Sequence, residues 1–364
     1  MSNLFQPYEK GALHLKNRVV MAPMTRSRAI GNMANELMAE YYAQRAEAGL
    51  IITEGASPSP NGVGYPRIPA IYNKEQASSW RQVTDAVHEK GSKIFLQIMH
   101  TGRVSHEKNL PKGGRVLAPS AIGVEAPFDK MYVDGEGMLP ISEPQAMTLE
   151  EVKSTIKEYA ETARLAVEAG FDGVELHGAN GYLINQFLNP KSNQRTDEYG
   201  GSGENRSRFL LEVTKATIDA IGKDKVGVRI SPYGVFNSMG AFEGIDAQYE
   251  FIARQLNAMG IAYLHMADMS AMTQVPVPDS IKQTLRREFS GTLILNGAYA
   301  KDSAQKDIEQ GKADLIAFGV PFIANPDLVT RMKENLPLAQ PDQSTFYTPG
   351  AQGYTTYAPA TVNA

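Results

Sequence analysis

Residues 173–206 read GVELHGANGYLINQFLNPKSNQRTDEYGGSGENR. An apolar run that ends at His177 is typical of a buried strand, and a glycine-containing turn then leads into an amphipathic segment. Polar side chains cluster where this strand ends. Because parallel α/β folds carry their chemistry at the carboxyl ends of the strands, we expect His177, Asn180 and Tyr182 to point into one pocket.

Similar apolar runs recur along the chain and alternate with segments of helical pattern. Strands are predicted at 19–22, 50–55, 93–100, 173–177, 226–232, 262–267, 292–297 and 315–319. Cap residues and glycine stops predict helices over 35–47, 73–90, 148–170, 202–221, 246–259, 279–289 and 301–310, and a last helix that begins at Asn325. About eight strand–helix units with short connections predict one α/β domain over residues 1–364, a TIM (β/α)8 barrel.

Three segments lie outside this repeating pattern. Residues 1–17 are short and glycine-broken, and we expect a small hairpin that plugs the base of the barrel. Residues 101–147, which follow the third strand, are rich in Gly and Pro and too long for an ordinary loop, so they predict a lid insertion. The tail from Pro341 is expected to fold back over the barrel mouth.

The composition excludes several classes of partner. The formal net charge is -4 with no basic run, which does not favour nucleic acid or an anionic membrane surface. No apolar stretch approaches the roughly 18 residues that a membrane helix needs. The absence of cysteine excludes disulfides and thiolate chemistry and suits a cytoplasmic location. The histidines are too few and unpatterned to indicate a metal site.

The residues at the predicted strand ends form one ring. It contains Thr25, Gly55, Gln97, Met99, His100, His177, Asn180, Arg229, Gly297, Ala298, Gly319 and Val320. The small residues after the seventh and eighth strands are suited to bind a phosphate through backbone N–H groups. The ring therefore predicts a pocket for a phosphorylated ligand.

Two of these polar residues also have structural explanations. A histidine at a strand end is often simply hydrogen-bonded within the fold, which is the alternative for His177. A cation in an apolar strand is costly to bury unless an anion meets it, so Arg229 could instead pair with Glu175 or Glu54. The sequence alone leaves both alternatives open.

Four further motifs, together with residues 173–206, carry a resemblance to a known family. They are NRVVMAPMTRSRA at 17–29, QRAEAGLIITEG at 44–55, QIMHTGR at 97–103 and FIANPDL at 322–328. Across nearly the whole chain, the sequence resembles the old yellow enzymes, FMN-dependent ene-reductases. The resemblance implies tight, non-covalent FMN and NADPH or NADH as the reductant.

The resemblance also implies a role for each ring residue toward the flavin. Thr25 would contact O4, Gln97 the pyrimidine edge, and Arg229 the region of N1 and O2. Gly55 would pack against the ring. The implied cofactor-binding set is Pro23, Met24, Thr25, Gly55, Gln97, Arg229, Asn296, Gly297, Ala298, Gly319 and Val320.

The implied reaction is the reduction of an activated C=C bond. His177 and Asn180 would hold the carbonyl or nitro oxygen, hydride would pass from flavin N5 to the β-carbon, and Tyr182 would protonate the α-carbon. Tyr65, Met99 and Tyr347 would complete the substrate pocket, although the two tyrosines could equally be rim packing. Enones, maleimides and nitro compounds are the implied substrates of a monomer or weak homodimer.

Two positions depart from the family pattern. Val320 stands where the family usually has an arginine on the FMN phosphate, which predicts looser FMN binding by about 1.5–3 kcal/mol. Met99 stands where many members have tryptophan, which predicts a wider pocket. The alternatives to the reductase are a TIM-barrel aldolase or isomerase on a phosphorylated substrate, and a flavin-binding barrel without activity.

Overall fold

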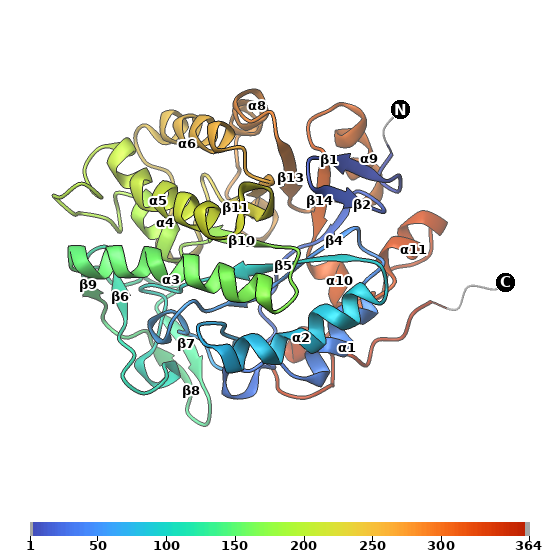
Figure 1. Ribbon diagram of the computed structural model, residues 1–364, viewed down its shortest axis with the longest axis horizontal. Coiled ribbons are helices and arrows are strands. Elements are labelled where there is room, and N and C mark those ends of the chain that lie inside the picture. The colour runs from blue at the N-terminus through green and yellow to red at the C-terminus, as the bar shows by residue number, and fades with distance from the viewer. Residues whose placement is uncertain (1–2, 361–364) are drawn as a thin grey trace.

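Within residues 3–360, which the computed structural model describes, eight parallel strands close a barrel in sequence order (Figure 1). They are β3 (Val19–Met21), β4 (Leu50–Ala56), β5 (Lys93–Ile98), β10 (Gly173–Gly178), β11 (Val226–Ile230), β12 (Tyr263–Ala267), β13 (Thr292–Asn296) and β14 (Leu315–Phe318). Every residue of these strands is buried except Lys93, because helices cover the outside and side chains fill the inside. The predicted TIM barrel is confirmed.

The barrel interior is apolar toward its base. The hairpin of β1 (Tyr8–Lys10) and β2 (Leu13–Leu15) packs there against strand residues such as Phe95 and Tyr263. The hydroxyl of Tyr8 is hydrogen-bonded to Thr292 Oγ1 at 2.8 Å. The hairpin therefore closes the base, as predicted, and leaves the opposite end for ligands.

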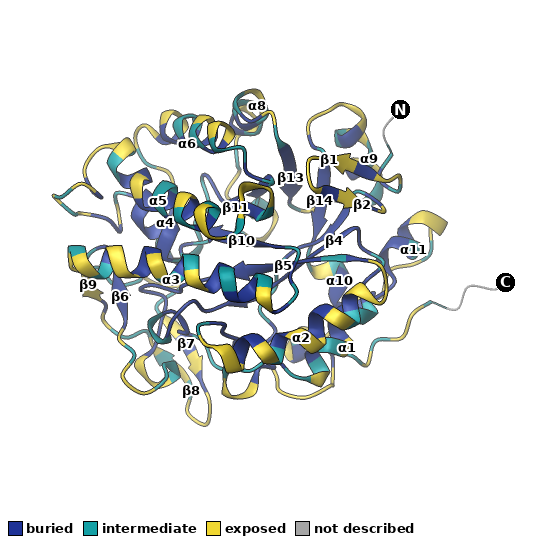
Figure 2. Ribbon diagram, viewed as in Figure 1, coloured by how far each residue is buried: buried dark blue, intermediate teal, exposed yellow. Residues whose placement is uncertain are grey.

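Helices lie around the barrel, and the long ones among them are amphipathic, with their buried sides toward the strands (Figure 2). They are α1 (Glu36–Gln44), α2 (Lys74–His88), α3 (Leu149–Glu168), α4 (Leu183–Leu188), α5 (Gly203–Ile221), α6 (Ile245–Met259), α7 (Ser270–Thr273), α8 (Asp279–Glu288), α9 (Lys301–Glu309), α10 (Val320–Ala324) and α11 (Leu328–Glu334). The predicted N-caps Asn35, Asn73, Thr148 and Ser202 each accept a backbone N–H bond.

The prediction for the last helix was wrong. Asn325 does not begin it but follows α10, and Asp327 precedes α11. The Asn325 amide Nδ2 donates instead to the carbonyls of Pro321 and Ala339, at 2.8 and 3.0 Å. The last helix therefore begins at Leu328 rather than Asn325, because a side chain that could cap a helix is used to hold the following loop, and α10 before it was not predicted.

The insertion after β5 is confirmed as a separate layer beside the barrel mouth (Figure 1). It contains β6 (Leu117–Ala118) paired with β9 (Gln145–Ala146), and a hairpin of β7 (Lys130–Val133) and β8 (Gly137–Pro140). Short strands suit a segment that has few apolar residues to bury. The β7–β8 hairpin contributes side chains to the mouth.

The C-terminal tail folds back over the mouth, as expected, and two buried arginines hold it there. Arg28 donates to the carbonyls of Thr345 and Phe346 at 2.8 and 2.7 Å, and Arg26 donates to the carbonyl of Gly353 at 2.8 Å. Backbone carbonyls that no regular element satisfies thereby gain charged donors. Within residues 3–360, no helix combines the length and apolar character of a membrane span.

Candidate active site

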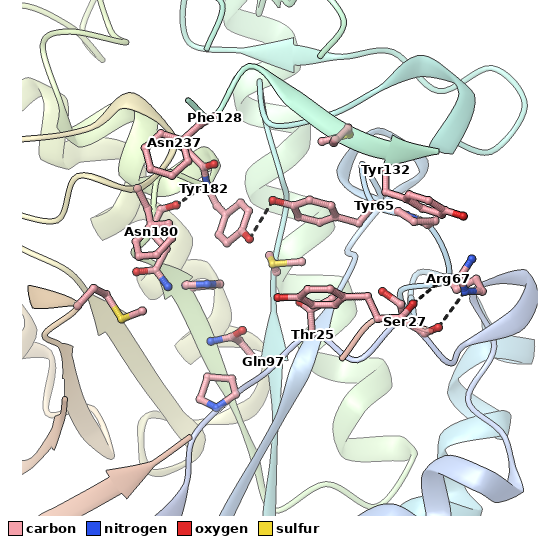
Figure 3. Close-up of a pocket in the computed structure, with 18 of the residues that line it drawn as sticks. Thr25, Ser27, Tyr65, Arg67, Gln97, Phe128, Tyr132, Asn180, Tyr182 and Asn237 are labelled. Carbon is pink, nitrogen blue, oxygen red and sulfur yellow. Dashed lines mark hydrogen bonds between the residues drawn. The ribbon is translucent and has the colours of Figure 1, made fainter. Parts of the chain in front are cut away.

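Two adjoining cavities, of about 470 and 370 Å³, open at the carboxyl ends of the barrel strands. They share the lining residues Pro23, Thr25, Asn180, Arg229, Met269, Met272 and Tyr347. His177 and Tyr182 line the larger cavity (Figure 3), and Gly297 and Gly319 line the smaller one. Together the cavities form one groove, in the place where TIM barrels carry their active sites.

The turn after β10 is held in an unusual conformation. Asn180 has φ 56°, a left-handed value that asparagine tolerates better than most residues. Its backbone N–H donates to Ser231 Oγ and its carbonyl accepts from Asn237 Nδ2, both at 2.8 Å (Figure 3). At the next residue, Gly181, a Cβ would lie 2.6 Å from that of Asn237. The turn therefore fixes the backbone of Asn180, and the side chain of Asn180 lines the cavity.

His177 and Asn180 both present polar atoms without protein partners. Nδ1 of His177 and Oδ1 of Asn180 are buried, and neither makes a hydrogen bond within the described residues. Burial, together with the nearby charge of Arg229, holds the pKa of His177 well below its ordinary value, so the imidazole is neutral near pH 7. The alternative of a histidine satisfied by hydrogen bonds within the fold is not supported.

The hydroxyl of Tyr182 lies in the same cavity. It is hydrogen-bonded to the hydroxyl of Tyr65 at 3.2 Å, and its ring packs edge-on against His177 with centroids 4.9 Å apart. Burial raises the pKa of Tyr182 to about 12, and its hydrogen bond with Tyr65 opposes that rise. Tyr182 is therefore protonated at neutral pH and can act as an acid.

Arg229 lies across the floor of the groove, with the residue 4% exposed. Its Nη2 donates to Asn296 Oδ1 at 2.7 Å, and its Nε has no partner within residues 3–360. No carboxylate lies within ion-pair distance of it in this part of the chain, so Arg229 forms no direct ion pair with Glu175 or Glu54, although the charge of Glu175 acts on it from farther away. A buried cation with a free donor is suited to an electron-rich ligand edge.

A row of polar side chains lies beneath the groove. Glu175 accepts a hydrogen bond from Gln97 Nε2 and lies beside His265 Nδ1, both at 2.8 Å. Burial raises the pKa of Glu175, but His265 and Arg229 outweigh it, and the net pKa is below the ordinary value. The anionic Glu175 thus fixes the Gln97 amide and balances the charge of Arg229.

The opposite end of the groove presents mainly backbone. The N–H groups of Gly297, Ala298 and Gly319 donate to no other residue among 3–360. Val320 is 45% exposed, and Arg26, which reaches this cavity, is already bonded to the carbonyls of Phe346 and Gly353. This end can therefore bind an anion through N–H groups, without a free guanidinium.

Almost all of the residues predicted for the site line the groove. Pro23, Met24, Thr25, Tyr65, Gln97, Met99, His177, Asn180, Tyr182, Arg229, Asn296, Gly297, Ala298, Gly319, Val320 and Tyr347 do so. Gly55 and His100 are the exceptions: His100 is buried behind the groove, where its Nδ1 accepts a hydrogen bond from the backbone N–H of Gly102 at 3.0 Å. A Cβ on Gly55 would lie 2.7 Å from Met99 Sδ, so its missing side chain makes room for Met99.

The sequence did not indicate several residues that line the groove. They are Ser27, Arg67, Phe128, Lys130, Met131, Tyr132, Met138, Phe236, Asn237, Asp268, Met269 and Met272. Most lie in loops, where no periodicity marks them. Phe128 and Phe236, for example, come from different loops and pack with ring centroids 5.7 Å apart.

Comparison with known proteins defines the class. The model of the NADH:flavin oxidoreductase / NADH oxidase family matches residues 3–339. A probable flavin mononucleotide-dependent alkene reductase from Leishmania infantum is 43% identical over 356 residues, which cover 97% of this chain and 96% of that protein. The chain therefore belongs to the NADH:flavin oxidoreductase / NADH oxidase family.

Solved structures narrow this class to the old yellow enzymes. Morphinone reductase in complex with tetrahydroNAD superimposes with a TM-score of 0.93 at 41% identity and covers 99% of this chain and 98% of its own. The old yellow enzyme homologue from Zymomonas mobilis gives 0.92 at 39% identity, with coverages of 98% and 99%. The predicted resemblance is confirmed, and the chain is an FMN-dependent oxidoreductase of the old yellow enzyme type.

The residues of the groove fit FMN. The unpaired donor of Arg229 and the fixed amide of Gln97 suit the polar edge of an isoalloxazine ring, and the free N–H groups of Gly297 and Gly319 suit a phosphate. FMN would supply hydride transfer, which no protein side chain can provide.

Proposed function

We propose that the protein reduces activated C=C bonds of α,β-unsaturated carbonyl and nitro compounds with NADPH or NADH. The observation that carries the proposal is the convergence of three groups on one cavity of about 470 Å³: the imidazole of His177, whose Nδ1 is unpaired within the described residues, the side-chain amide of Asn180, and the hydroxyl of Tyr182. FMN would be held tightly but non-covalently. These assignments rest on the placement of the side chains.

His177 and Asn180 bind the substrate oxygen. A neutral imidazole N–H and an amide N–H donate to it without a net charge that would need a counter-ion. Because the His177 side chain is buried and the Asn180 backbone is held at both its N–H and its carbonyl, little reorganisation accompanies binding. Withdrawing electron density through that oxygen makes the β-carbon electrophilic.

Tyr182 then gives its Oη proton to the α-carbon. The neighbouring Tyr65 hydroxyl, 3.2 Å away, can donate a hydrogen bond to the phenolate that remains. This stabilises the charge that develops on Tyr182 as the proton leaves. Tyr65 therefore supports the acid, and Tyr347, Met99 and Tyr65 bound the substrate.

The proposal also covers the domain organisation, oligomeric state and location of the protein. We expect one domain over residues 1–364, of which 1–2 and 361–364 lie outside the described residues, as a monomer or weak homodimer in the cytoplasm. The family assignment leaves no support for the aldolase or isomerase alternative. A flavin-binding barrel without activity is the remaining competitor.

The test is an anaerobic experiment on the purified protein. We expect a yellow preparation whose flavin absorbance bleaches with NADPH or NADH and returns with 2-cyclohexenone. Reduction without reoxidation by any enone, maleimide or nitro compound would favour the inactive barrel. A preparation that stays colourless and takes up no added FMN would overturn the proposal.

A further inference from the structure

Large apolar side chains remain exposed around the mouth of the larger cavity. Tyr132 is 48% exposed, Met138 61%, Met272 64% and Tyr347 61%, and all four line that cavity. Single exposed apolar residues are ordinary, but a cluster around one opening is typical of a binding surface. This cluster, the outer rim, lies beyond the catalytic groups, because His177 and Tyr182 lie deeper in the barrel.

The outer rim is built from three separate segments. Tyr132 and Met138 come from the β7–β8 hairpin, Met272 from α7 and Tyr347 from the tail. Methionine is unbranched and polarizable, so it adapts to ligands of different shape. The rim therefore offers a deformable apolar surface that is continuous with the catalytic cavity.

Arg67 joins two of these segments to the barrel. Its Nε donates to the carbonyl of Ser27 at 3.0 Å and its Nη2 to that of Tyr347 at 2.8 Å (Figure 3). Its Nη1 pairs with Asp134, in the turn of the β7–β8 hairpin. Two of the three rim segments are thus held in place before a ligand arrives, which lowers the entropy cost of binding.

We infer that the outer rim is a subsite for an apolar substituent on the alkene, so that the enzyme prefers activated alkenes with extended hydrocarbon groups over small ones. The inference rests on the proposed function. Full burial of one methylene group is worth about fourfold in binding. Because the subsite is open on one side, we expect about 1.8-fold per methylene, which is about tenfold over four methylenes.

The test uses N-ethyl-, N-butyl- and N-hexylmaleimide with the flavoprotein reduced beforehand. Anaerobic stopped-flow absorbance gives the second-order rate constant of flavin reoxidation for each. We expect the constant to rise about tenfold from the ethyl to the hexyl compound. In the Met138→Gln, Met272→Gln double variant, the ratio of hexyl to ethyl should fall to about threefold, since two apolar contacts are lost.

Ile30→Gln is the matched control, because Ile30 is 62% exposed but does not line the cavity. It should keep the tenfold ratio. Met138→Gln alone should give an intermediate ratio and serves if the double variant does not fold. A ratio near one in the unmodified protein, or an equal fall in the control, would overturn the subsite while leaving the reductase intact. Failure of every maleimide to reoxidise the flavin would overturn both.

Discussion

The two ends of the ligand groove hold their polar atoms by different means. At the β10 and β11 end, side chains provide the donors: His177, Asn180 and Arg229 are buried or held by hydrogen bonds. At the β13 and β14 end, backbone N–H groups provide them, and Val320 is 45% exposed. The β10 and β11 end is preorganised and carries the charge of Arg229. The β13 and β14 end is open, and among residues 3–360 no unpaired cation lines it.

This difference predicts that one end of the groove controls the reaction and the other controls how tightly the cofactor is bound. Buried side-chain donors act at low effective dielectric, so changes there should alter reaction and ligand affinity strongly. Exposed backbone donors hold an anion, but solvent screens them and no side chain can be removed from them. Changes at the second end should therefore affect how long the cofactor stays, and by smaller factors.

The largest effect is expected from Tyr182→Phe. Removing the acid should slow alkene reduction by about 10²–10⁴-fold and leave flavin reduction by NADPH unchanged. Stopped-flow measurement of both half-reactions checks this, with Tyr159→Phe as a control that removes a buried hydroxyl outside the groove. Equal losses in both half-reactions would show that Tyr182 is not the proton donor.

The pH dependence follows from the same residue. Because the pKa of Tyr182 is raised to about 12, the phenol keeps its proton through pH 10. The rate of alkene reduction should be flat from pH 6 to 10 and fall only as pH rises toward 12. A fall centred near pH 7 would instead point to a histidine as the acid, although the lowered pKa of His177 argues against that.

His177→Ala is the second test of the preorganised end. The loss of one donor to the substrate oxygen should weaken enone binding by about tenfold to a hundredfold, since a buried acceptor is left without its hydrogen-bond partner. Titrating flavin absorbance with a non-reducible ligand of the same shape gives the dissociation constant. His14→Ala, at an exposed position of strand β2 far from the groove, should leave it unchanged.

Val320→Arg tests the open end. A guanidinium at this position should tighten FMN by about tenfold, from one charge-assisted hydrogen bond discounted for exposure. Riboflavin, which lacks the phosphate, should bind equally to both proteins. Fluorescence titration of the apoprotein with each flavin makes the comparison. If both proteins bind FMN equally tightly, the backbone N–H groups are enough to hold the phosphate. The two ends of the groove would then differ less in how firmly they hold a ligand than we infer.

Arg67→Ala should have the smallest effect. It removes hydrogen bonds to two carbonyls and an ion pair to Asp134, and the free energy of unfolding should fall by about 1 kcal/mol. Hydrogen exchange should speed up at Tyr347 and in the β7–β8 hairpin. Lys108→Ala, which loses the pair with Glu136 in the same turn, is the control and should leave Tyr347 protected.

Much of the site was predictable because strand ends are marked in the sequence. Apolar runs locate the strands, and parallel strands bring the residues that follow them to one mouth. The same reasoning failed for Gly55, whose missing side chain serves Met99 rather than the cavity. It also failed for Asn325, because a cap residue cannot be told from a loop anchor without the neighbouring chain.

Apolar runs, helical periodicity and cap residues determined the barrel, and the strand ends that they mark located His177, Asn180, Tyr182 and Arg229. These features depend on contacts between neighbours in the chain. The outer rim, the partners of Glu175 and the three contacts of Arg67 depend on segments up to 280 residues apart. Only the folded chain brings such segments together, because loops carry no periodicity that would reveal where they pack.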